Sequence, residues 1–179
     1  MELKEILSSV TDWLKFAETK NAVLVTTSGV GFWSLIRLLL NQNFSFYLEL
    51  YFFSFSLFFF GSFLIGLLSF LPVLNYSIII PRQSGRKKNI LYFGYLATLS
   101  KSDLVKEYHN VSNQPGNEVS EIDSMMAEQI ILNSRIALTK YKFFEYGVNS
   151  IVLGALTPII GCVLLIVIKK RRDKIDGFG

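Results

Sequence analysis

Three long stretches without a charged residue constrain this chain more than any other feature. They contain 32, 23 and 16 residues, and they lie between Glu49 and Arg82, between Glu145 and Lys169, and between Lys20 and Arg37. A helix crosses the hydrocarbon core of a membrane with about 20 mostly apolar residues. Only 18% of the whole chain is charged, against about 25% in ordinary soluble domains. The sequence therefore predicts an integral membrane protein.

The expected fold is all-α. Residues 22–40, 50–74 and 146–168 each have the length of a spanning helix, and residues 41–44 are too few to join the first two except as a helical hairpin. We expect long helices at roughly 3–40, 46–73 and 119–169. The expected parts begin with the amphipathic cytoplasmic part of the first helix (1–21) and a two-span transmembrane hairpin (22–74). A small cytoplasmic regulatory insert (75–142) follows, and a long helix continues from it into a third transmembrane helix (143–168). A basic tail (169–179) ends the sequence.

Two apolar seams precede the first and third spans. The first consists of Leu3, Leu7, Val10, Leu14, Ala17 and Leu24, with Asn21 at an intervening seam position; the second consists of Ile122, Met126, Ile130, Asn133, Ala137 and Tyr141. The second follows Ser120–Asp123, which resembles a capping box, and Ser100–Asp103 can cap a short helix through His109. We expect the seams to contact each other, within or between chains. The alternative is that the second helix lies flat at the membrane surface.

Arg37 and Glu49 are the only charges at membrane depth in the predicted hairpin. They lie six positions on either side of residue 43, so they can face each other near one membrane interface. One interpretation is an ion-pathway or gating pair. The other is an arginine that extends toward the interface, with a structural partner that sets the register of the hairpin.

The basic run Arg82, Arg86, Lys87 and Lys88 also has two interpretations. It follows the second predicted span, where positive charge marks the cytoplasmic side and attracts anionic lipid. It can also capture a phosphate-bearing ligand, because the aromatic residues Tyr92, Phe93 and Tyr95 follow closely and offer faces on which a base could stack.

Enzyme and metal chemistry find no support in the motifs. Ser84 and Lys87 fit Ser-x-x-Lys but lack the companion motifs of acyl enzymes. Cys162 is the only cysteine and His109 the only histidine, so no Cys/His cluster is available. We expect no enzyme, no catalytic residue, no metal and no resident cofactor. Because the first residues lack a basic signal-peptide region, we expect the N-terminus to be retained.

The ordered combination of these segments resembles a known family over nearly the whole chain. It consists of the amphipathic helix ending at 16–20, the two-span hairpin, Pro81-Arg82, the block 89–100, and a helix with Arg135, Lys140 and Tyr141 that enters the last span. These features are similar to the transmembrane effectors of the bacterial Pycsar antiphage system. The chain departs from the resemblance at Glu18 and Tyr95, where members tend to have Asp.

The resemblance implies a membrane effector that senses cCMP or cUMP, a cyclic pyrimidine mononucleotide made by a partner pyrimidine cyclase on phage infection. Activation would impair the inner membrane and cause abortive infection. The implied partners are this nucleotide, the lipid bilayer and further copies of the chain, with no nucleic acid polymer. The competing hypothesis is a non-enzymatic membrane scaffold that presents a helical coil to a cytosolic partner.

A cyclic mononucleotide carries one phosphate charge and a planar base, so its site needs cationic or N–H donors and an aromatic or apolar surface. We expect this site in the cytoplasmic insert. The expected contacts are Arg82, Arg86, Lys87, Lys88, Asn89, Tyr92 and Phe93, completed by Arg135 or Lys140 from the second long helix.

The distribution of positive charge predicts the orientation in the bacterial inner membrane. Residues 82–142 hold nine Lys and Arg residues and the hairpin loop holds none, so the N-terminus and the central insert are expected in the cytoplasm. Three spans then place the five basic residues of 169–174 outside, against the positive-inside tendency. Either the insert outweighs them, which we favour, or the last segment does not cross fully.

Overall fold

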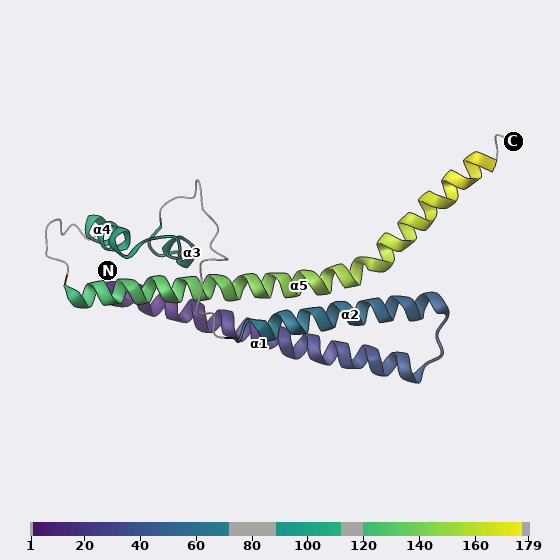
Figure 1. Ribbon diagram of the computed structural model, residues 1–179, viewed down its shortest axis with the longest axis horizontal. Coiled ribbons are helices and arrows are strands. Elements are labelled where there is room, and N and C mark those ends of the chain that lie inside the picture. The colour runs from purple at the N-terminus through teal and green to yellow at the C-terminus, as the bar shows by residue number, and fades with distance from the viewer. Residues whose placement is uncertain (1, 72–88, 112–119, 177–179) are drawn as a thin grey trace. The chain divides into compact units, whose positions relative to one another are not determined.

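The computed structural model describes residues 2–71, 89–111 and 120–176, with side chains described as far as residue 161. The helices in these ranges are α1 (Leu3–Asn41), α2 (Phe46–Leu68), α3 (Phe93–Leu96), α4 (Lys101–Val111) and α5 (Glu121–Asp176) (Figure 1). The same ranges contain no strand. The predicted all-α class is therefore confirmed.

Three of these helices can cross a membrane. Within the described residues, α1, α2 and the part of α5 up to Gly161 are long and apolar enough to do so. This confirms the expected three-span membrane protein.

The end of α2 differs from the expectation. The helix begins at the expected residue but ends at Leu68 rather than near 73. The Phe70 N–H donates to the Leu67 carbonyl (3.0 Å) and the Leu71 N–H to the Leu68 carbonyl (3.2 Å), so the chain tightens into turns there. A proline at position 72 has no N–H to bond the carbonyl of Leu68, four residues earlier, so the sequence does not allow a regular helix to continue there. Residues 72–74 lie outside the described part of the chain.

The end of α5 also differs. The helix runs to Asp176, whereas the expected helix ends near 169. The basic segment 169–174 is therefore helical. Lys, Arg and Asp are compatible with helix, and no Gly or Pro occurs between Gly161 and Asp176.

The chain divides into two compact units. The first comprises Met1–Val23 and Leu67–Glu145, and the second comprises Leu24–Gly66 and Tyr146–Gly179. Both α1 and α5 contribute residues to both units, α1 on either side of residue 23 and α5 on either side of residue 145.

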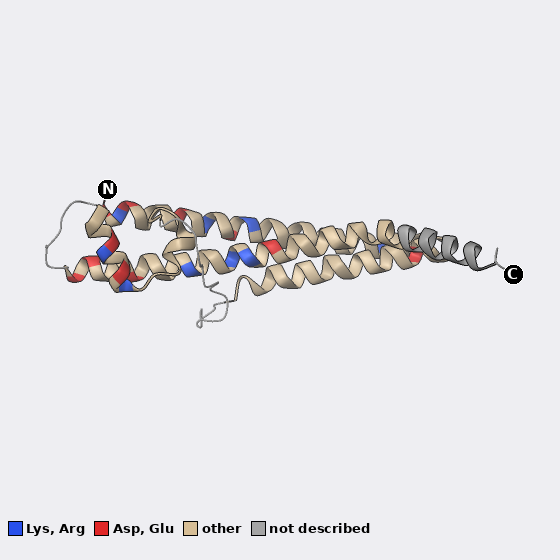
Figure 2. Cartoon of the chain, turned by 90° about the horizontal axis from the view of Figure 1, so that it is seen from above, with Lys and Arg blue, Asp and Glu red and all other residues tan. Residues whose placement is uncertain are grey.

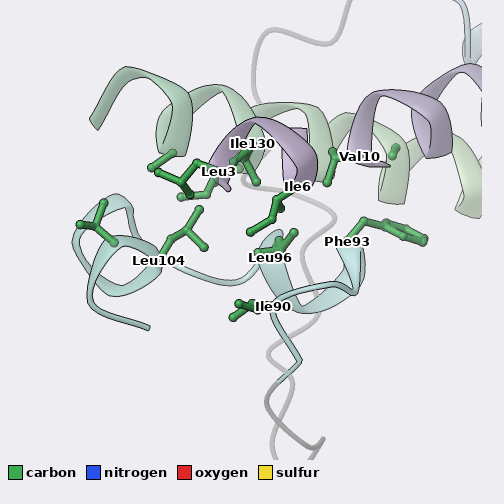
Figure 3. Close-up of a cluster of buried hydrophobic side chains, with 12 residues drawn as sticks. Leu3, Ile6, Val10, Ile90, Phe93, Leu96, Leu104 and Ile130 are labelled. Carbon is green, nitrogen blue, oxygen red and sulfur yellow. The ribbon is translucent and has the colours of Figure 1, made fainter. Parts of the chain in front are cut away.

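The first unit has a hydrophobic core to which α1, α3, α4 and α5 all contribute (Figure 3). Its buried members are Leu3, Ile6, Val10, Ile90, Phe93, Leu96, Leu104, Val105, Ala127, Ile130, Ile131 and Ala137. Leu7, Leu14 and Met126 are partly buried against this core. The two predicted seams thus meet in one core, which confirms the expectation that they pack together.

Two seam residues differ from the prediction. Ile6, which the four-three spacing omits, is fully buried, because α3 and α4 also cover α1 and the apolar stripe must be wider than a two-helix seam. Ile122 in the first turn of α5 is 65% exposed, so the second seam begins one turn later than expected.

The predicted helix starts are confirmed by side-chain caps. The Ser100 hydroxyl accepts the Asp103 N–H (3.2 Å) and donates to the Asp103 carboxylate (2.6 Å) at the start of α4. The Ser120 hydroxyl accepts the Ile122 N–H (3.3 Å) at the start of α5. Both serines satisfy backbone donors that a helix start leaves without partners.

The second unit has small residues inside and bulky apolar residues outside. On α2 the buried residues are Ser56, Ser62 and Gly66, and the Ser150 hydroxyl on α5 donates to the Phe58 carbonyl (3.0 Å). The large apolar side chains of α2 are exposed, among them Phe46, Leu50, Phe53, Leu57, Phe60 and Leu64. Small residues let membrane helices approach closely, while exposed Phe and Leu side chains suit lipid.

A Cβ atom at Gly66 or Gly154 would disturb this close packing. At Gly66 it would lie 2.6 Å from a Val25 methyl, and at Gly154 it would lie 2.7 Å from the Phe58 Cβ. Glycine is therefore needed at both positions. Most of the charged residues lie on segments of the first unit (Figure 2), and residues 24–66 of the second unit contain only two, Arg37 and Glu49.

Candidate functional site

Arg135 of α5 is hydrogen-bonded to the segment that joins α3 and α4. Its Nε donates to the Ala97 carbonyl (3.0 Å), and its Nη2 donates to the Leu99 carbonyl (3.3 Å). These two hydrogen bonds tie α5 to the turn between α3 and α4. A guanidinium has five N–H donors, and these two hydrogen bonds use two of them.

A pocket opens beside Arg135. Its volume is about 280 Å³, and its lining residues are Leu99, Lys101, Glu128, Ile131, Leu132 and Arg135. Lys101 and Glu128 form a salt bridge of 3.1 Å at its edge, and both side chains are exposed, so this pair contributes little to stability. The pocket combines two cations, one carboxylate and apolar walls. It can therefore accept a small anion that also carries an apolar or planar group.

The residues just before and within α3 divide between surface and core. Asn89 is exposed, and its side-chain oxygen accepts the Leu91 N–H (2.9 Å). Tyr92 is 37% exposed. Phe93 is only 8% exposed, and its ring stacks on Tyr141 with centroids 5.3 Å apart and also contacts Trp13. The expected open face of Phe93 is therefore absent from this arrangement, because its ring is part of the core.

Four expected contacts lie outside the described residues. These are Arg82, Arg86, Lys87 and Lys88.

Tyr95 joins α3 to α4. Its hydroxyl donates to the Glu107 carboxylate (2.6 Å). Burial, and then the hydrogen bond and charge of Glu107, raise the pKa of Tyr95 to about 12. Tyr95, one of the two positions at which the chain departs from the family resemblance, thus carries a neutral phenol that is hydrogen-bonded to Glu107.

Lys140 is also occupied by contacts within the chain. Its ammonium lies 3.2 Å from the Glu18 carboxylate and donates to the Ser69 carbonyl at 3.2 Å. Its side chain is only 14% exposed. The backbone carbonyl of Lys140 accepts the side-chain N–H of the fully buried Asn21 (2.9 Å). Lys140 therefore joins α1, α5 and the chain after α2, and its charge is already compensated by Glu18.

Sequence reasoning missed the surroundings of Lys20. Its ammonium lies over the rings of Phe16, Phe144 and Tyr141, at 4.7, 5.3 and 5.4 Å from their centroids. Cation–π contacts of this kind stabilise a cation beside apolar surface. The i, i+4 spacing of Phe16 and Lys20 was the available signal, whereas the two rings from α5 could be found only from the packing.

Arg37 and Glu49 are both described, and no ion pair joins them in the hairpin. Arg37 lines a pocket of about 250 Å³ with Trp33, Ile36, Leu40 and Asn41. Glu49 lines a different pocket of about 470 Å³ with Ile36, Leu39, Leu40, Phe46, Leu50 and Phe53. The two charges lie in neighbouring pockets that share Ile36 and Leu40, and the expected meeting of the two side chains is not observed among the described residues.

Metal-ligating side chains do not gather within residues 2–71, 89–111 and 120–161. No group of three or more His, Cys, Asp or Glu residues there could hold an ion.

A comparison with known protein families identifies the family of the chain. A family model described as PycTM, Pycsar effector protein domain, matches residues 2–167. No curated protein and no solved structure matches the chain. The resemblance drawn from the short motifs is therefore confirmed.

Proposed function

Because the chain belongs to the family of Pycsar effector proteins, which are transmembrane effectors of antiphage defence, we propose that it senses a cyclic pyrimidine nucleotide and impairs the membrane. The family is one of effectors and not a known catalytic family. In this proposal the ligand is cCMP or cUMP from a partner pyrimidine cyclase. The outcome is damage to the inner membrane and abortive infection.

The observation that carries the proposal is the sharing of α1 and α5 between the two units. Both helices begin in the first unit, which holds most of the charged residues. Each also supplies an apolar segment that is long enough to span a membrane. A ligand that prefers one packing of the first unit therefore acts on helices that are themselves spans. Its effect on the spans is limited by its difference in affinity for the two packings.

The pocket beside Arg135 supports a site for the nucleotide. Arg135 and Lys101 supply cationic donors for the single phosphate charge, and Leu99, Ile131 and Leu132 supply apolar walls for the base and sugar. Its volume of about 280 Å³ lies just below the range of about 300–1,000 Å³ for small-molecule sites, which favours a mononucleotide over larger signalling nucleotides.

The other expected contacts complete the proposal. The exposed Tyr92 and Asn89 are the described residues that lead to the basic run 82–88. We assign the run and these two residues to the same ligand-binding region.

The proposed orientation has the N-terminus and the central insert in the cytoplasm. It rests on the nine Lys and Arg residues of 82–142 and their absence from the hairpin loop. A nucleotide made in the cytoplasm then reaches the pocket without crossing the membrane.

Calorimetry on the full-length protein in nanodiscs tests the sensing step. We expect cCMP or cUMP to bind and cAMP to bind more weakly. Lys101→Gln should weaken binding about tenfold, because one charge-assisted hydrogen bond contributes roughly 1.5 kcal/mol. The matched control is Lys106→Gln, an exposed cation on the same helix that does not line the pocket.

The outcomes separate the two parts of the proposal. Equal affinity for the wild type and Lys101→Gln would remove the pocket from the site while leaving the sensing function intact. Absence of binding by both pyrimidine nucleotides would contradict the sensing function and leave the scaffold hypothesis.

A further inference from the structure

Two opposite charges are exposed on the hairpin of the single chain. Arg37 lies four residues before the end of α1 and Glu49 three residues after the start of α2, and both side chains are exposed. With a rise of 1.5 Å per residue, they lie about 6 and about 5 Å from the hairpin ends of their helices. The two charges are therefore at nearly the same depth along the spans.

Neither charge is compensated within the described hairpin. No ion pair or hydrogen bond is found for either side chain there. Charges within membrane spans are costly, and they commonly pair or face a protein interior. Among the residues that the structure describes, Arg37 and Glu49 each lack such a partner.

The surroundings of Glu49 form an apolar groove with one carboxylate. The groove has a volume of about 470 Å³, and every other residue that lines it is Ile, Leu or Phe. The neighbouring face around Arg37 presents one cation beside Trp33 and Leu40, which are both exposed. The two faces are complementary in charge, and both present apolar side chains around the charge.

We propose that the hairpin binds a second copy of this chain, with Arg37 of one copy placed in the groove against Glu49 of the next. A rotation about the membrane normal keeps every residue at its depth, so copies related in this way bring the two charges to the same level. The apolar side chains that flank Arg37 then fill the groove around the ion pair. This contact needs no nucleotide, so it is independent of the proposed ligand.

Charge reversal in two separately tagged chains tests the contact. A chain with Arg37→Glu carries two carboxylates at the interface, and a chain with Glu49→Arg carries two cations. The dissociation constant for self-association of each variant alone should be at least about tenfold higher than that of the wild type, because like charges meet at the interface. Mixing the two variants should restore co-purification through the tags, because opposite charges then meet between chains.

An ion pair within one chain could not be repaired by mixing. Wild-type self-association by either single variant, or no recovery in the mixture, would overturn the proposal. Lys106→Glu is the control, since it reverses a charge on α4 in the first unit.

A cross-linking experiment keeps both charges and does not depend on the folding of the reversed variants. One tagged chain carries Trp33→Cys and the other Phe53→Cys, both with Cys162→Ser. Trp33 lines the face of Arg37, and Phe53 lines the groove of Glu49. Mild oxidation of the reconstituted mixture should give a disulfide between chains. Replacing Phe53→Cys by Leu64→Cys, which lies deeper on α2, should reduce the yield at least tenfold, and equal yields would contradict the contact.

Discussion

Removing the Leu96 side chain should loosen α3 and α4 from the rest of the first unit. Leu96 is 0% exposed and lies in a core to which four helices contribute (Figure 3). Leu→Ala substitutions at buried sites cost about 2–5 kcal/mol, depending on how far the surroundings collapse. Because Ile6 and Ile130 belong to long helices that cannot easily move inward, we expect a loss of about 3 kcal/mol for Leu96→Ala.

Hydrogen exchange of the backbone amides in α3 and α4, measured by mass spectrometry on the full-length protein in nanodiscs, checks this value. A loss of about 3 kcal/mol corresponds to roughly a hundredfold faster exchange where local opening limits it. Leu91→Ala is the matched control, since Leu91 is 55% exposed and lies five residues earlier. We expect it to change exchange less than about threefold. Similar effects of both substitutions would refute the packing described for α3.

Two further predictions concern an ionisable group and a helix contact. The raised pKa of Tyr95 means that the stability contributed by its neutral phenol is present below pH 10 and is lost as pH rises to about 12. The melting temperature of the wild type should fall more steeply over this range than that of Tyr95→Phe, which lacks the bond to Glu107, and parallel curves would argue against this coupling. Gly154→Ala should destabilise the second unit by about 1–3 kcal/mol through overlap with Phe58. Gly161→Ala should not, since no atom lies within 4 Å of its new Cβ, and thermal unfolding in nanodiscs compares the two.

The long helices and their facing residues could be predicted from the sequence because each depends on local spacing. The lengths of the charge-free stretches determine which segments can span, and the seven-residue recurrence from Leu3 through Val10 to Ala17 determines which side of α1 is apolar. All three residues are buried as this pattern predicts. The burial of Ile6 was not predicted. It belongs to a core to which α3 and α4 also contribute, and a spacing rule for two packed helices does not take these short helices into account.

The roles of individual site residues depended on contacts between distant parts of the chain. Phe93 was expected to face a ligand, but its ring is covered by Trp13 and Tyr141 from two other helices. The charge of Lys140 is compensated by Glu18 from the N-terminal helix. No local sequence pattern specifies such pairings. A side chain that could bind a ligand, judged from its neighbours in sequence, can instead be held by a residue from a distant part of the chain.

The hairpin charges show the limit of a symmetry argument. The equal spacing of Arg37 and Glu49 from residue 43 predicted a common depth, and the structure places them about equally far from the ends of their helices. Depth alone does not determine the direction of a side chain around its helix. Since one residue corresponds to a rotation of about 100°, the face of each charge had to come from the packing of α1 on α2.

Nucleotide-triggered leakage from vesicles tests the central claim most directly. The full-length protein is reconstituted into dye-loaded vesicles, and cCMP or cUMP is added from the side that carries the first unit. We expect one of these nucleotides to release the dye, and we expect Lys101→Gln to need about tenfold more of it while Lys106→Gln behaves as the wild type. Leakage that does not depend on either nucleotide, or no leakage when binding is saturated, would contradict the claim that binding in the first unit acts on the membrane spans.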